Sequence, residues 1–199
     1  TFQYLDYDVD MHPIGAQLCG SKPQLAGQAA RMLQEFGFDV IDFNCGCPVD
    51  KVTKDGSGSA MLKHPELIGE ILSQMVSAVS IPVTVKVRAG WDCQSINAQQ
   101  VTSLAEQAGA QAIIVHGRTR SQGYQEPANW GHIRDCKSVA RTIKVFGNGD
   151  IMEAEDALAM LQQTGCDGVL VSRGTLGKPW IADDIRRMAS GESLPVRPL

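Results

Sequence analysis

Short, nearly continuous apolar runs recur along the chain and alternate with longer segments that are typical of helices. Runs of this kind are typical of strands that are buried on both faces of a sheet. They predict strands over residues 14–18, 40–45, 81–88, 112–118, 143–146 and 168–172. The segments between and after them predict helices that end near residue 36 and that cover residues 65–79, 98–108, 130–138, 153–163 and 180–188.

The residues between these elements predict where they begin and end. Ser21 and Gln24 form a capping-box pattern at the start of the first helix. Residues 51–59, rich in Gly, Ser and Lys, and residues 119–128 are expected to be loops. Residues 1–10 are acidic and irregular, and residues 195–199 form a tail.

Regular alternation of strand and helix predicts a parallel sheet covered by crossover helices. A doubly wound sheet fits the alternation as well, but polar residues gather where the strands end, which favours a (β/α) barrel of the TIM type. The six predicted units are two fewer than a closed eight-stranded barrel contains. We therefore expect residues 1–199 to form one partial barrel domain that lacks the first two units.

Composition narrows the classes of protein that remain. The chain has 199 residues, 43% of them hydrophobic, and a formal net charge of −4, which gives no support for nucleic-acid binding. It contains no apolar run long enough to span a membrane, and no signal peptide precedes the first strand. Its six cysteines suit neither a disulfide framework nor a zinc site, so we expect a cytoplasmic protein without a structural metal.

The predicted strand ends carry polar side chains. Asn44 lies near the end of the second strand, and Gly46 and Pro48 end that strand, which places Cys47 in a loop. Gln17 adds another amide at the end of the first strand. These residues resemble a catalytic rim that could bind a flat heteroaromatic ring; alternatively, the strand is simply buried and its cysteines act as small hydrophobic residues.

Two further strands end in cationic or imidazole groups. Because side chains alternate along a strand, Lys86 and Arg88 share one face, and three valines share the other. Lys and Arg inside a barrel require an anionic partner; the alternative is an edge strand with one solvated face. His116 and Arg118 share a face in the next strand. A single His is more often structural than catalytic. His116, however, lies at the end of a further strand that carries polar side chains, which favours a functional role.

The last two strands end in turns of small residues, Gly147–Asp150 and Ser172–Thr175. Glycines allow backbone N–H groups to approach an anion, and Arg173 adds positive charge. In TIM barrels the loops after strands seven and eight often bind phosphate. A ligand with a phosphate at one end and a planar polar ring at the other would satisfy all these signals, and flavin mononucleotide (FMN) fits that description.

Six segments together resemble the tRNA-dihydrouridine synthases over nearly the whole chain. They are Asp42–Pro48, the Gly-Ser-Gly-Ser-Ala-Met-Leu run from Gly56, Lys86–Arg88, His116–Thr119, Asn148–Asp150 and Ser172–Gly174. The Asn-x-Gly-Cys-Pro element is the most specific of them. The resemblance implies an FMN-containing barrel that reduces the 5,6-double bond of uridine in tRNA, with NADPH reducing the flavin again.

The resemblance also implies roles for individual residues. Cys47 matches the general acid that protonates carbon 5 of the uracil, and thiols are mostly protonated at neutral pH. Cys45, two residues earlier, is interpreted as a packing residue. The expected cofactor-binding residues are Gln17, Lys86, His116, Asn148, Gly149, Asp150, Arg173 and Gly174, and the expected substrate-side residues are Asn44, Arg88 and Arg118.

Two parts typical of that family are not found in the sequence. One is the opening strand with an Ala-Pro-Met flavin contact, and the other is the C-terminal helical domain that binds tRNA. We therefore expect tRNA to be bound mainly through parts that this chain does not contain.

Three other functions remain compatible with the residues. A dihydroorotate-type dehydrogenase acting on a free pyrimidine has a related site, but usually has Ser at the position of Gly46. An aldolase-type barrel could use Lys86 as a Schiff base, with Arg88 lowering the pKa of the lysine. A non-catalytic barrel fragment could bind only a nucleotide or a partner protein.

Overall fold

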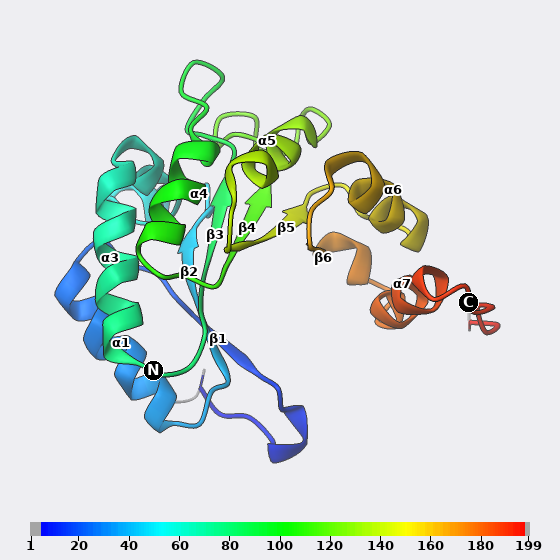
Figure 1. Cartoon of the computed structure of the whole chain (residues 1–199), viewed down its shortest axis with the longest axis horizontal. Helices are drawn as coiled ribbons and strands as arrows, with labels where there is room; N and C mark the ends of the chain where they lie inside the picture. The colour runs from blue at the N-terminus through cyan, green and yellow to red at the C-terminus, as the bar shows by residue number, and fades with distance from the viewer. Residues whose placement is uncertain (1–4, 198–199) are drawn as a thin grey trace.

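The computed structural model describes residues 5–197, and six parallel strands form its centre (Figure 1). Each strand pairs with its neighbour in the chain, so the order across the sheet is β1-β2-β3-β4-β5-β6. This is the arrangement of a barrel wall, and it excludes a doubly wound sheet, in which the strand order reverses. The strands are β1 (Gly15–Leu18), β2 (Val40–Cys45), β3 (Val83–Arg88), β4 (Ala112–His116), β5 (Lys144–Asn148) and β6 (Gly168–Leu170).

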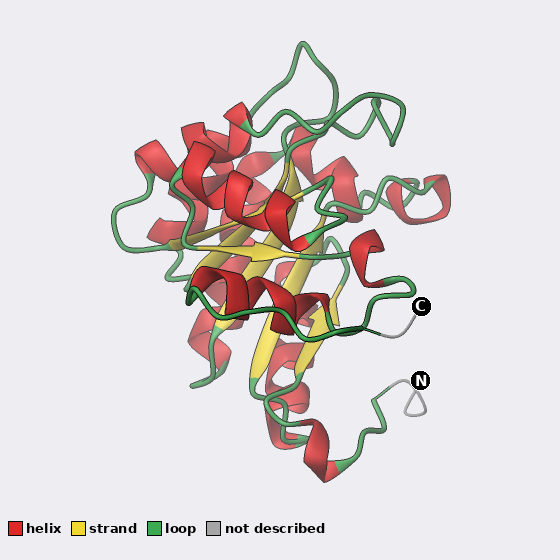
Figure 2. Cartoon of the chain, turned by 90° about the vertical axis from the view of Figure 1, so that its right-hand side faces the viewer, coloured by secondary structure: helices red, strands yellow, loops and turns green. Residues whose placement is uncertain are grey.

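Helices connect the strands and cover the outer face of the sheet, each packing against the next in the chain (Figures 1 and 2). The long helices are α1 (Pro23–Glu35), α3 (Pro65–Ala78), α4 (Ala98–Gln107), α5 (Gly131–Val139), α6 (Ala154–Thr164) and α7 (Ile181–Ala189). All lie within about two residues of the predicted ranges, which is the usual uncertainty of a helix end. The core lies between these helices and the sheet.

Strand β3 shows how the alternation of side chains divides the sheet into two faces. Val83, Val85 and Val87 are buried in the outer core against the helices. Thr84 and Lys86 therefore lie on the opposite, inner face. The predicted orientation of Lys86 is confirmed, because this residue lines a cavity on the inner face.

The structure corrects several local predictions. Ser21 and Gln24 form no capping box: Lys22 is the N-cap of α1, Pro23 begins the helix, and the Ser21 hydroxyl donates to the carbonyl of Asp55. The proline already fixes a helical φ, so the first turn needs no side-chain cap. The expected loop at residues 51–59 contains a short helix, α2 (Asp50–Thr53), and the start of a 3₁₀ helix, η3 (Gly58–Lys63).

The ends of the chain differ from the prediction in smaller ways. A 3₁₀ turn, η2 (Val9–Met11), lies in the segment expected to be irregular, of which residues 1–4 lie outside the described part. Another 3₁₀ turn, η4 (Arg173–Thr175), follows β6, which is shorter than predicted. Between residues 5 and 197, no helix is both long and apolar enough to cross a membrane.

Candidate active site at the strand ends

A cavity of about 320 Å³ opens on the inner face, at the carboxyl ends of the strands. Such a position is where TIM barrels carry their active sites, and the volume lies in the range of ligand pockets. The predicted site residues that line it are Gln17, Asn44, Cys47, Lys86, Arg88, His116, Asn148, Gly149, Asp150 and Arg173. Arg118 and Gly174 do not line it.

Cys47 is held at the rim by backbone contacts on both sides. The amides of Gly46 and Cys47 both donate to Oδ1 of Asn44 at 3.0 Å. The Cys47 carbonyl accepts from the amide of Ser59 at 3.0 Å. Gly58 allows this approach: its φ is +59°, and a Cβ there would lie 2.9 Å from the Cys47 carbonyl oxygen. The thiol is therefore carried by a loop whose backbone is fixed.

Cys45 has a different environment from Cys47. It is completely buried in the core, whereas Cys47 is partly exposed and lines the cavity. Burial, followed by the nearby charge of Asp42, raises the pKa of the Cys45 thiol well above its usual value. Cys45 is thus an inert packing residue, as the sequence predicted.

Lys86 and His116 are positioned on neighbouring strands inside the cavity. Desolvation and then the charge of Arg88 lower the pKa of Lys86 to about 8, so it stays mainly protonated at neutral pH. Desolvation, together with the cations Arg88, Lys86 and Arg118, lowers the pKa of His116 to about 3. The cavity therefore presents one ammonium group and one neutral imidazole.

Arg88 is almost fully buried, and its guanidinium connects two loops. Nε donates to the carbonyl of Gly46 at 3.0 Å, and Nη1 donates to the carbonyls of Thr119 at 2.8 Å and Gly123 at 3.2 Å. It lines the cavity, as predicted, but these bonds also tie the Cys47 loop to the loop after β4. Burial lowers the pKa of Arg88 from its usual value.

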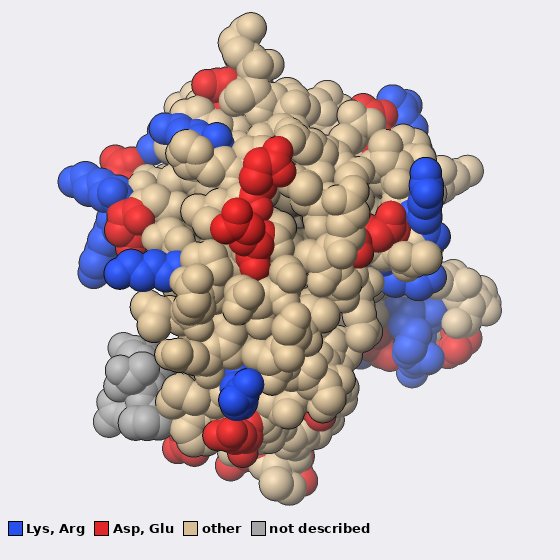
Figure 3. Space-filling model, turned by 60° about the vertical axis from the view of Figure 1, so that its left-hand side comes forward, with Lys and Arg blue, Asp and Glu red and all other residues tan. Residues whose placement is uncertain are grey.

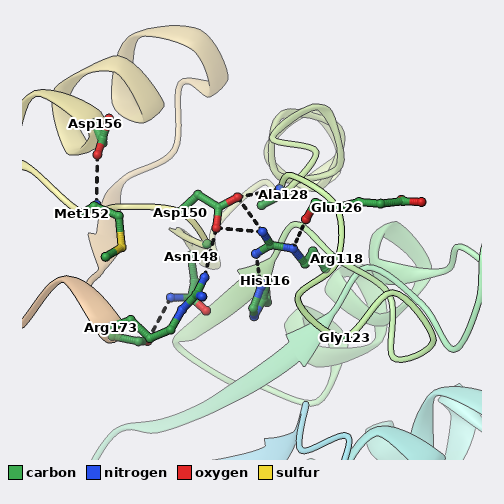
Figure 4. Close-up of polar contacts among 12 residues, drawn as sticks. His116, Arg118, Gly123, Glu126, Ala128, Asn148, Asp150, Met152, Asp156 and Arg173 are labelled. Carbon is green, nitrogen blue, oxygen red and sulfur yellow. Dashed lines mark hydrogen bonds and ion pairs between the residues drawn. The ribbon is translucent and has the colours of Figure 1, made fainter. Parts of the chain in front are cut away.

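Arg118 lies behind the cavity wall, where it binds Asp150 rather than the cavity (Figure 4). Its Nη2 donates to both carboxylate oxygens of Asp150, at 2.8 and 2.7 Å. Its Nε donates to the carbonyl of Glu126. Only 4% of Arg118 is exposed. The structure thus assigns it a supporting place, and the predicted contact with substrate has no geometric support.

Arg173 and Arg118 share the carboxylate of Asp150 at the cationic end of the cavity. Asp150 has a φ of +57°, and its carboxylate also accepts from the amide of Ala128 at 2.7 Å. Arg173 donates to the same carboxylate at 3.1 Å and lies over the ring of Tyr124, with 4.5 Å between Cζ and the ring centroid. Two guanidinium groups and one carboxylate leave a net positive charge at this end (Figure 4).

Two glycines allow the backbone turns around this cationic end to pack closely. A Cβ on Gly149 would lie 2.8 Å from the Cβ of Ala128, and its φ of +117° also favours glycine. A Cβ on Gly174 would lie 2.3 Å from the carbonyl oxygen of Ile151. Gly174 therefore packs the turn after β6 against the loop after β5 and contributes no surface to the cavity.

The prediction from sequence missed several residues of the site. Asp42 is on the inner face two residues before Asn44, so strand alternation alone could have identified it. Tyr124 and Met152 line the cavity from loops, where no periodic signal exists. The described residues contain no cluster of His, Cys, Asp and Glu that could hold a metal.

The cavity fits the two ends of FMN by the chemistry of its residues. The turns that only glycine can form, together with Arg173, give a cationic cradle suited to a phosphate. The amide of Gln17 and the ammonium of Lys86 lie at the other end, where they suit the polar edge of a flavin ring.

Comparison with known proteins agrees with this geometry. The family model described as dihydrouridine synthase matches residues 2–199. The tRNA-dihydrouridine synthase B of Pseudomonas aeruginosa is 43% identical over 98% of this chain and 59% of the relative. That of Pseudomonas syringae is 44% identical over 94% of this chain and 55% of the relative. The chain thus spans less than two thirds of the length of these relatives.

Solved structures support the fold alone. The dipeptide epimerase of Enterococcus faecalis is superimposed with a TM-score of 0.62 at 13% identity, over 89% of this chain and 43% of that chain. The fold is accordingly an α/β barrel of the TIM type, of which the structure describes six units. From its sequence match and its strand-end cavity, the chain belongs to the dihydrouridine synthase family.

Proposed function

We propose that the protein binds FMN in the strand-end cavity and reduces the 5,6-double bond of uridine in tRNA, with NADPH as the reductant. The observation that carries the proposal is a single cavity that contains Cys47, Lys86 and the ion pair of Arg173 and Asp150. The relatives named tRNA-dihydrouridine synthase B support the choice of uridine in tRNA as substrate.

The residues divide the chemistry between them. Bound FMN would supply the hydride for carbon 6 of the uracil. Cys47 donates the proton to carbon 5, because its loop places a partly exposed thiol at the cavity. Lys86, protonated at neutral pH, binds the electron-rich edge of the flavin ring. His116 stays neutral and acts as a hydrogen-bonding group.

Neither the net charge of the chain nor the face shown in Figure 3 offers RNA an extended basic surface. The net charge is −4, and the face in Figure 3 carries Lys, Arg, Asp and Glu intermixed, without a continuous basic area. Phosphate contacts need clustered cations. We therefore place only the target uridine on this chain and assign most contacts with tRNA to other parts of the enzyme.

The first test concerns the cofactor. The purified full-length enzyme should take up FMN stoichiometrically, with the absorbance of a bound flavin, and Arg173→Glu should lose it, because a second carboxylate beside Asp150 repels a phosphate. Arg186→Glu is the control, because it makes the same charge change on α7. There Arg186 forms ion pairs with Asp183 of the helix and Glu192 just after it. Stoichiometric flavin in Arg173→Glu would refute the phosphate assignment.

The second test concerns the reaction. Unmodified tRNA incubated with the flavin-loaded full-length enzyme and NADPH should gain dihydrouridine, detected as a mass increase of about 2 Da for the two hydrogens added to the 5,6-double bond. A protein that binds FMN and forms no dihydrouridine in any tRNA would favour a role limited to binding.

A further inference from the structure

Polar side chains on the inner face of the sheet form a series of hydrogen bonds that runs from Asp42 to the loop carrying Cys47. Asp42 accepts from Nε2 of Gln17 at 2.6 Å, and the Oε1 of Gln17 accepts from Nδ2 of Asn44 at 2.7 Å. Oδ1 of Asn44 then accepts the two loop amides, of Gly46 and Cys47, at 3.0 Å. Asp42 also accepts from the Thr84 hydroxyl at 2.7 Å.

The two ends of this chain of hydrogen bonds fix the orientation of both amides. At the loop end, two backbone N–H groups require the oxygen of Asn44, which turns its nitrogen toward Gln17. At the other end, burial raises the pKa of Asp42, whereas the hydrogen bonds from Thr84 and Gln17 favour its ionised form. The ionised carboxylate only accepts, so the nitrogen of Gln17 faces Asp42. Turning either amide by 180° would bring two donors or two acceptors together.

We propose that Asp42 is a positioning residue for Cys47: through the amides of Gln17 and Asn44, its carboxylate holds the loop that carries the thiol. Asp42 touches neither the loop nor the thiol in any of these bonds, so its effect is indirect. The inference rests on the proposed function only in taking Cys47 as the reacting residue. The geometric effect on the loop can be measured without any reaction.

Moving the carboxylate from one end of the chain of hydrogen bonds to the other provides the test. In Asn44→Asp, the carboxylate at position 44 still accepts the loop amides but now faces the oxygen of Gln17. Rotating the Gln17 amide by 180° relieves this contact but places the amide oxygen of Gln17 against the carboxylate of Asp42. In the double variant Asp42→Asn with Asn44→Asp, Gln17 can turn and every donor again meets an acceptor. Asn at position 42 then donates to Gln17 and still accepts from Thr84.

Hydrogen exchange of the Gly46 and Cys47 amides, measured residue by residue, is the readout. Asn44→Asp should speed exchange by about three- to tenfold, the effect of one poorly made hydrogen bond. Although it carries a second change, the double variant should return to within about twofold of the original protein, because the two sites are coupled. Asp42→Asn alone still offers an oxygen to Nε2 of Gln17, so exchange of the two loop amides should stay close to that of the original protein; this variant is the matched control.

The two compared variants share the change at residue 44 and differ only at residue 42, so any difference in exchange between them arises from the side chain at position 42. The rate of alkylation of Cys47, read by peptide mass, should follow the same order as the exchange rates. Exchange in the double variant as fast as in Asn44→Asp would overturn the inference. If the exchange pattern holds but even the unaltered protein forms no dihydrouridine, the positioning role stands and the proposed function fails.

Discussion

Two cysteines separated by one glycine have opposite environments, and the difference arises from where β2 ends. Cys45 is the last residue of the strand, with its side chain on the outer, fully buried face. Cys47 lies beyond the break at Gly46 and lines the cavity. A reactive thiol needs access and a fixed position, and only Cys47 has both.

In the full-length enzyme, we expect Cys47→Ala to retain FMN and to be reduced by NADPH, but to form dihydrouridine about 10²- to 10⁴-fold more slowly, the usual effect of losing a general acid. Cys45→Ala should change the rate little and lower the free energy of unfolding by about 1 kcal/mol through lost packing. Single-turnover dihydrouridine formation and urea unfolding measure the two effects. Loss of turnover in Cys45→Ala with near-normal turnover in Cys47→Ala would reverse the assignment.

His116 should make the stability of the protein depend on pH. Its folded pKa of about 3 is below the value of about 6.5 expected in the unfolded chain. Between these values the unfolded chain binds a proton that the folded protein does not, so the free energy of unfolding falls as the pH is lowered. From about pH 7 to pH 5.5 the loss through His116 is about 1 kcal/mol.

His116→Gln removes this titration and keeps a neutral polar side chain, so its stability should decrease less over the same pH interval. Urea unfolding of both proteins at the two pH values gives the comparison. Equal slopes for the two proteins would show that His116 titrates in the folded protein as it does in the unfolded chain.

The direction in which a side chain faces could be predicted from sequence where strand alternation fixes it. Lys86 and Cys45 follow from their positions in strands with clear apolar alternation. Arg118 lies beyond β4, and the loop after it supplies the Glu126 carbonyl that turns its guanidinium away from the cavity. No periodic pattern describes that loop, so the orientation of Arg118 could not be predicted.

Among the secondary-structure elements, the helix starts show which local signals are specific. The Ser21 pattern looked like a capping box, yet a capping box forms instead at Glu153 and Asp156, at the start of α6. Pro23 fixes the start of α1 without any cap. Helix and strand positions were predictable because burial imposes them, whereas the choice among capping solutions depends on neighbours that sequence does not specify.

The turn η4 should be sensitive to a single methyl group. In Gly174→Ala the new Cβ would lie 2.3 Å from the Ile151 carbonyl oxygen, so one of the two loops must move. We expect the free energy of unfolding to fall by about 1–3 kcal/mol, as in other overpacked sites, and FMN to bind more weakly. Gly20→Ala, which meets nothing within 4 Å, is the control for urea unfolding and flavin titration.

At the scale of the whole molecule, burial decreases from the middle of the sheet toward both edges. The described sheet begins at β1 and ends at β6, each of which pairs on one side only. In β3, four of the six residues are buried, whereas β6 has none, and Leu170 at its end is 37% exposed. The order of strands was predictable from the alternation, but this gradient depends on which neighbours cover each strand.

We therefore expect local stability to follow the same gradient. Amides of Val85 and Val87 have strands on both sides and lie under α3 and α4, so they should open only with global unfolding. Amides of Val169 and Leu170 lie on an edge strand of three residues, and they should exchange through local opening. Native-state hydrogen exchange in low urea distinguishes the two, because global opening depends on urea and local opening hardly does. Equally slow, urea-dependent exchange in β6 would mean that another chain segment or a second copy covers that edge in solution.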